Sequence, residues 1–130
     1  MNDERRKSGR PQDLKERTKE FALLVIRLYS ALPKTAEAQV IGRQLLRSGT
    51  SVGAQYREAA RARSAAEFVS KIQSALQELD ESAYWLELLS DANIVAPERV
   101  SDLAAEANEL TAIFVASAKT AKARMRNASR

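Results

Sequence analysis

Cysteine and histidine are both absent from the 130 residues of this chain, and glycine (4) and proline (3) are scarce. Without cysteine the chain has no disulfides, thiolate zinc sites or cysteine nucleophiles. Without histidine it lacks the usual general base near neutral pH, the Glu-x-x-His di-iron pattern and every Ser-His-Asp triad. These two absences remove the commonest catalytic and metal-binding side chains.

Long hydrophobic runs are missing as well. The longest uninterrupted apolar stretch is Phe21 to Ile26, whereas a membrane-spanning helix needs about 20 residues. Residues 1–12 are polar and charged, with no apolar stretch typical of a secretory signal. We therefore expect a cytoplasmic protein with no membrane partner.

The residues that remain favour helices, because alanine, leucine, arginine and glutamate dominate a chain long enough for one domain. Apolar residues recur with a helical period in four segments, at about 13–32, 36–62, 65–91 and 98–122. Helices of similar length joined by short loops pack as antiparallel neighbours. We predict an all-α fold, an antiparallel up-down-up-down four-helix bundle over residues 13–122.

The ends of the chain are predicted to lie outside the bundle, residues 1–12 as a flexible polar tail and residues 123–130 as a basic tail. Within it, Thr35 is a predicted N-cap, and Ser64 to Glu67 form a capping-box pattern. The capping box predicts a break between the second and third helices. The alternative is one continuous helix through Arg63.

Each predicted helix has an apolar stripe expected to face the core. The stripes are Leu14, Phe21, Leu24, Val25, Leu28 and Leu32; Ile41, Leu45, Gly49, Val52, Tyr56 and Ala59; Phe68, Ile72, Ala75, Leu76, Leu79, Ala83 and Leu86; and Val100, Leu103, Ala107, Leu110, Phe114 and Ala118.

The glycine-containing stretch from Arg47 to Gly53 does not form a phosphate-binding P-loop, because no strand precedes it and the Gly-Lys-Ser/Thr ending is missing. We interpret Gly42, Gly49 and Gly53 as small residues that allow close packing along one helix face. A local kink or a binding role is the alternative.

Four carboxylates in the third predicted helix, Glu78, Asp80, Glu81 and Glu87, are the strongest candidates for acid-base chemistry or magnesium binding. On a helical wheel, however, Glu78, Glu81 and Glu87 point away from the apolar stripe. We interpret them as a solvated or interface face. We expect no enzymatic activity, no metal site and no cofactor.

The same helix has surplus apolar residues. Tyr84, Trp85 and Leu88 fall outside the stripe that contains Leu86, so this turn is apolar nearly all round. Contact with two neighbouring helices would explain part of this. We predict instead that these three residues form an oligomer interface, because tyrosine and tryptophan are enriched there.

Basic residues are segregated along the chain, whose net charge is +4. In the second helix, Arg43, Arg47, Arg57 and Arg61 form a stripe about 27 Å long. The C-terminal segment adds Lys119, Lys122, Arg124 and Arg126. Such a surface matches the phosphates of an RNA or DNA backbone. Alternatively, the stripe arginines pair with Glu78, Glu81 or Glu87, on the same chain or on a neighbouring subunit.

Two motifs resemble a known family. The first comprises Leu46-Arg47-Ser48-Gly49-Thr50-Ser51-Val52-Gly53-Ala54, Tyr56-Arg57-Glu58-Ala59, Ala62-Arg63-Ser64, Glu67-Phe68 and Lys71; the second comprises Asp80-Glu81 and Tyr84-Trp85-Leu86-Glu87-Leu88-Leu89. Together they resemble the four-helix-bundle family of 23S rRNA intervening-sequence proteins, over roughly Phe21 to Ser117. Gln55 stands where members usually have asparagine, and Ser82-Ala83 replaces Thr-Leu.

The resemblance implies a non-enzymatic bundle encoded within insertions in bacterial ribosomal RNA genes and assembled as a ring-like homo-oligomer, with a pentamer expected. The accessory variability protein of diversity-generating retroelements resembles this family in using the same bundle, and it binds nucleic acid and a reverse transcriptase. From residues and resemblance together, we expect a homo-oligomer that binds structured RNA through its basic surface. The alternative is an accessory subunit that docks a reverse transcriptase.

Overall fold

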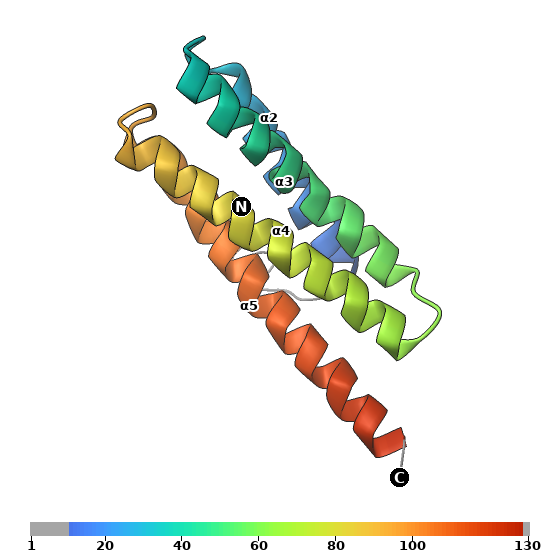
Figure 1. Ribbon diagram of the computed structural model, residues 1–130. Helices are drawn as coiled ribbons and strands as arrows, with labels where there is room; N and C mark the ends of the chain where they lie inside the picture. Colours follow the sequence, from blue (N-terminus) through green and yellow to red (C-terminus); the bar gives the residue numbers. More distant parts are fainter. Residues whose placement is uncertain (1–10, 129–130) are drawn as a thin grey trace.

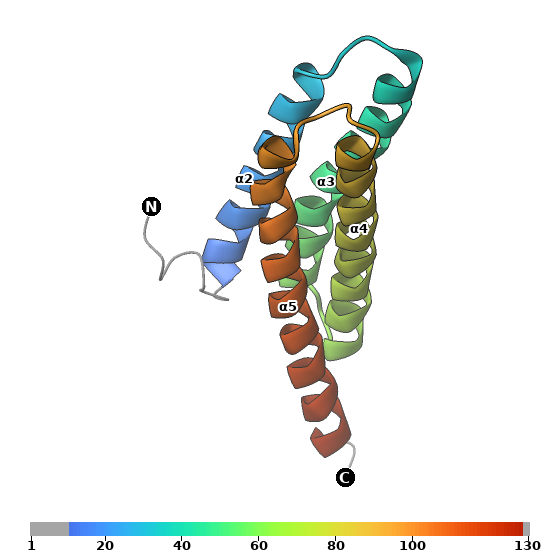
Figure 2. The ribbon, with the colours of Figure 1, turned by 90° about the vertical axis from the view of Figure 1, so that its left-hand side faces the viewer.

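The computed structural model describes residues 11–128; most of the predicted N-terminal tail and the last two residues lie outside this part. The described residues form four helices, α2 (Pro11–Ser30), α3 (Ala36–Ala60), α4 (Ala65–Asp91) and α5 (Pro97–Ala128). Consecutive helices run antiparallel, with the α2–α3 and α4–α5 loops at one end and the α3–α4 loop at the other (Figures 1 and 2). The predicted all-α, up-down-up-down four-helix bundle is confirmed.

The helix boundaries follow local capping signals. Thr35 precedes α3, and its side chain accepts a hydrogen bond from the Ala38 N–H at 3.4 Å. Ser64 accepts from the Glu67 N–H at 3.0 Å, while the Glu67 carboxylate accepts from the Arg63 N–H at 3.3 Å. The predicted break between α3 and α4 is therefore confirmed, and the continuous helix through Arg63 does not form.

The fourth helix is longer than the sequence pattern predicts. α5 continues to Ala128, so most of the segment expected as a basic tail is helical. No proline or glycine follows Pro97, and alanine, lysine, arginine and methionine are good helix formers. At 32 residues α5 is about 48 Å long, and its C-terminal turns project beyond the other helices (Figures 1 and 2).

The core runs along the whole bundle, and most of the predicted stripes are buried, including all six predicted residues of α5. Leu24 is the clear error, since its side chain is 42% exposed. It lies seven residues after Arg17, on the side of α2 that faces α5. These two helices have few contacts with each other, so this side of α2 is incompletely covered.

A buried ion pair links α2 to α5. Arg17 is 3% exposed, and two of its guanidinium nitrogens contact the Glu106 carboxylate, Nε at 3.1 Å and Nη2 at 2.6 Å. A bidentate pair of this kind fixes both orientation and distance. Arg17 therefore holds α2 against α5 where apolar contacts between them are sparse.

The glycines of α3 allow α2 to pack closely. A Cβ atom on Gly49 would lie 2.8 Å from Val25 Cγ2, and one on Gly42 would lie 2.5 Å from Leu32 Cδ1. These are distances that real Cβ atoms do not reach without movement of the neighbour. The interpretation of these glycines as close-packing residues is confirmed for Gly42 and Gly49.

Candidate nucleic-acid interface

The central arginine of the predicted α3 stripe is paired within its own chain. Arg47 Nη2 lies 2.6 Å from Glu81 Oε1, and Arg47 Nη1 lies 3.4 Å from Glu78 Oε2. A buried contact between Ser48 and Ser82, with their Oγ atoms 2.8 Å apart, sets α3 and α4 in the register that produces this pairing. For Arg47, the alternative of pairing with α4 is therefore correct.

The other three arginines of the stripe differ from Arg47. Arg43, Arg57 and Arg61 are exposed, and their side chains make no ion pair with the described residues 11–128. Arg61 also borders a polar cavity of about 360 Å³ beside the α3–α4 loop, and its lining mixes the cations Arg63 and Lys71 with the carboxylates Glu58 and Glu67. The stripe therefore consists of a neutralised centre with free cations on both sides.

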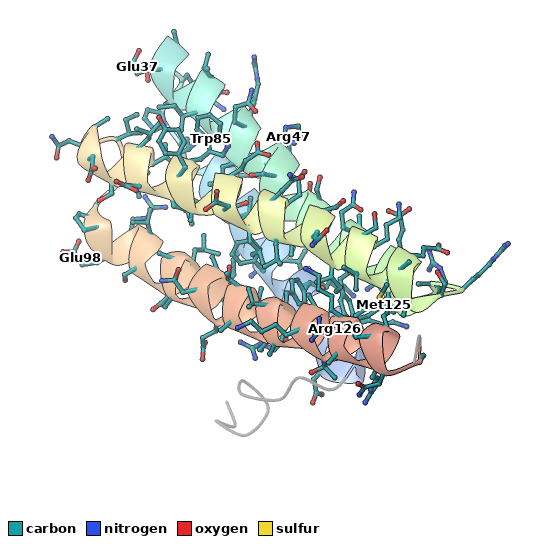
Figure 3. The ribbon with its side chains drawn as sticks, turned by 60° about the horizontal axis from the view of Figure 1, so that its bottom comes forward. Glu37, Arg47, Trp85, Glu98, Met125 and Arg126 are labelled. Carbon is teal, nitrogen blue, oxygen red and sulfur yellow. The ribbon has the colours of Figure 1, made fainter. Side chains whose placement is uncertain are left out.

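The basic residues near the C-terminus lie on the projecting part of α5. Lys119, Lys122, Arg124 and Arg126 are all exposed. At 100° per residue, Lys119, Lys122 and Arg126 share one side of the helix, whereas Arg124 points to another side. Figure 3 shows Arg126 at this end of the molecule, far from Glu37 and Glu98 at the opposite end.

The antiparallel topology separates charge along the length of the bundle. The end with the α3–α4 loop comprises residues 11–20, 54–76 and 115–128, and we call it the basic end. It has eleven basic and five acidic residues, a net charge of +6. The remaining described residues, 21–53 and 77–114, have five basic and ten acidic residues, a net charge of −5.

Sequence reasoning missed part of this cluster. Lys15 and Lys19 of α2 and Arg63 of the α3–α4 loop belong to the basic end, although none lies in the α3 stripe or near the C-terminus. The signal was present in the sequence, because α2, α4 and α5 have most of their basic residues in the half that reaches this end, whereas α3 has Arg43 and Arg47 in its other half. Recognising it requires the chain direction of all four helices at once.

The predicted interface residues of α4 have different environments. The Tyr84 side chain is 52% exposed and Leu88 is partly exposed, as an interface would require. Trp85 is partly buried and packs against the core, and its place in an oligomer interface stays a prediction. Other large apolar residues are exposed elsewhere, notably Leu23 and Ile26 on α2.

Within residues 11–128 no cluster of His, Cys, Asp or Glu side chains is placed to hold a metal ion. The clearest perturbed titratable group is Tyr56, where burial raises the pKa of the hydroxyl; its ring stacks on Phe114 in the core. No helix between residues 11 and 128 is apolar over enough of its length to span a lipid bilayer.

Comparisons with known proteins agree with this architecture. A family model described as 23S rRNA-intervening sequence protein matches residues 11–116. A crystal structure from Bacteroides thetaiotaomicron, of a protein with unknown function from the S23 ribosomal protein family, has 35% sequence identity and a TM-score of 0.78. The similarity covers 84% of this chain and 97% of that one. The search of curated proteins found no match.

Proposed function

Because this chain belongs to the 23S rRNA-intervening sequence protein family, we propose that it binds structured RNA without catalysing a reaction on it. The basic end provides the binding surface, and the contacts are made to the phosphate backbone. The protein acts as a homo-oligomer, so that several copies of the basic end contact one RNA molecule.

The observation that carries the proposal is the concentration of positive charge at one end of the bundle. Arg57, Arg61 and Arg126 are exposed there without ion pairs to the described residues. An unpaired arginine can form a bidentate contact with phosphate, whereas Arg47 has carboxylate partners already. Arg47 is therefore excluded from the proposed surface.

The proposed contacts favour RNA structure over RNA sequence. Contacts to phosphate position a protein on its target but carry no sequence information. A surface built from helices and cations also lacks the aromatic-studded sheet that some RNA-binding domains use to read several bases. We therefore expect affinity to depend strongly on salt and weakly on sequence.

Binding to a structured RNA, measured against salt concentration, tests the proposal. The variant Arg57→Ala/Arg61→Ala/Arg126→Ala removes three charges from the basic end. If each contacts one phosphate, the slope of log K against log salt becomes shallower by about 2 to 3. The matched control is Arg27→Ala/Lys34→Ala/Arg99→Ala, which removes three exposed charges from the opposite end.

We expect the control to keep the parental slope and the basic-end variant to lose affinity. Equal slopes for the two variants would show that binding follows net charge and not the basic end, which contradicts the proposal. Light scattering on both variants separates an effect on RNA contact from an effect on assembly, because the subunit number changes only in the second case.

A further inference from the structure

An apolar groove lies at the basic end, between the first turn of α4 and the projecting part of α5. Its volume is about 600 Å³, and its walls include Phe68 from α4 and Ile113, Thr120 and Arg124 from α5. Three alanines and Ser117 complete the lining. The volume is within the range of about 300–1,000 Å³ that is usual for small-ligand sites.

The groove lies where α5 runs alongside the start of α4, with Ala65 and Phe68 on the α4 wall. Near this end of the core the rings of Tyr56 and Phe114 are stacked, with their centroids 5.6 Å apart, and the last buried core residue of α5 is Ala118. Beyond Ala118, α5 continues for about 15 Å, and Phe68 is only partly buried against the core. An aromatic side chain is thus left partly accessible next to a cationic one, Arg124.

We propose that this groove binds one unpaired nucleobase of the RNA. This inference rests on the proposed function, and it specifies that the target has a base outside its helical stacks. The base packs against Phe68 and the alanines, and Arg124 contacts a flanking phosphate. Stacking of an unpaired base on an aromatic side chain is a general mode of RNA recognition.

Two hydroxyl groups can contact the polar edge of such a base. The Ser117 hydroxyl donates to the Ile113 carbonyl oxygen at 3.0 Å, which leaves its oxygen able to accept a hydrogen bond. Among the described residues, the Thr120 side chain has no hydrogen-bond partner, so it can donate or accept. The groove therefore combines an apolar wall, two hydroxyls and one cation.

Charge and composition favour a nucleobase over other occupants. Residues 1–10 contain no large apolar side chain other than Met1, so they do not match an apolar groove. A second copy bound through the same end would bring two surfaces of net charge +6 together, which is unfavourable. A polyanion with exposed bases matches both the charge of this end and the apolar wall of the groove.

Two RNA hairpins that differ by a single base provide the test. One has a bulged 2-aminopurine nucleotide, and the other has an abasic nucleotide at the same position, so their phosphates are identical. The native protein should bind the first hairpin about 5- to 100-fold more tightly and change the 2-aminopurine fluorescence. Phe68→Leu should remove this preference and keep the salt dependence, while Phe68→Tyr should retain both.

Several outcomes would overturn the inference. Equal affinity of the native protein for the two hairpins would contradict the nucleobase site and leave backbone binding intact, whereas no binding to either hairpin would overturn both proposals. A Phe68→Leu variant that keeps the preference but loses subunits would assign the groove to a protein contact. If Phe68→Leu does not fold, Thr120→Val on the exposed helix surface must still lower the preference several-fold.

Discussion

Gly49 shows how one missing side chain sets the distance between two helices. A Cβ atom at this position would meet both methyl groups and the Cβ of Val25, at 2.8, 3.0 and 3.2 Å. Val25 is β-branched and has little rotamer freedom in a helix. The close approach of α2 and α3 therefore depends on glycine here, despite the low helix propensity of this residue.

We predict that Gly49→Ala destabilises the protein by about 1 kcal/mol. Overpacking costs about 1–3 kcal/mol, and the higher helix propensity of alanine offsets about 1 kcal/mol of this cost. Denaturant unfolding measures this value. In a Val25→Ala background the two methyl contacts are removed and the 3.2 Å contact with Cβ remains, so Gly49→Ala should become close to neutral or stabilising. An unchanged effect in that background would show that the two residues are not coupled.

Much of the residue-level environment could be predicted from periodicity alone, and the exceptions have physical causes. All predicted core residues of α5 are buried, because this helix keeps one regular apolar stripe from Val100 to Ala118. Leu24 was predicted to be buried but is exposed, because α2 and α5 are incompletely packed against each other. This gap is a property of the assembled bundle and not of the periodicity of α2. The pairing of Arg47 with Glu78 and Glu81 also depends on the register of α3 and α4.

Among the helices, α5 differs in continuing beyond the bundle. Its last turns lack any buried side chain after Ala118 within the described residues, so tertiary packing contributes little to their helical state. The sequence predicted a tail here because the apolar stripe stops. The helix continues since no residue ends it, and boundaries without a stop signal are the hardest to derive from sequence.

We predict that a chain ending at Lys122 has nearly unchanged stability, within about 1 kcal/mol, because none of the described residues after Lys122 is buried and substitutions at such positions usually have small effects. Its RNA affinity should fall, since Arg124 and Arg126 are removed together with Arg130. Thermal unfolding and binding at several salt concentrations measure the two effects. The control Arg124→Gln/Arg126→Gln keeps the helix, so equal losses in both variants would assign the effect to charge.

For the whole molecule, assembly depends on which apolar surface contacts another subunit. Tyr84 and Leu88 on α4 are exposed to different degrees, and Leu23 and Ile26 on α2 are partly exposed as well. Trp85 is a poor probe of assembly, because its packing against the core means that truncation also affects folding. The α4 pair Tyr84/Leu88 and the α2 pair Leu23/Ile26 provide a cleaner comparison of the two surfaces.

We predict that the protein is a homo-oligomer at micromolar concentration and that Tyr84→Ala/Leu88→Ala reduces its mass. Interface aromatic residues often contribute more than 1 kcal/mol each, enough to shift the equilibrium toward smaller species. Light scattering measures the mass of this variant and of the matched variant Leu23→Ala/Ile26→Ala, which tests the alternative surface on α2. If only the α2 variant dissociates, the interface prediction for α4 is wrong.

The uneven charge along the bundle also affects how the molecule would meet a polyanion. A bundle with a net charge of +6 at its basic end and −5 over the other described residues is an electric dipole, and the field of an RNA exerts a torque on it. Approaches with the basic end forward are accelerated, while approaches from the opposite direction are repelled. At physiological salt this electrostatic orientation extends over only about 8 Å, the Debye length. Because added salt shortens this distance further, it should slow association more than it speeds dissociation.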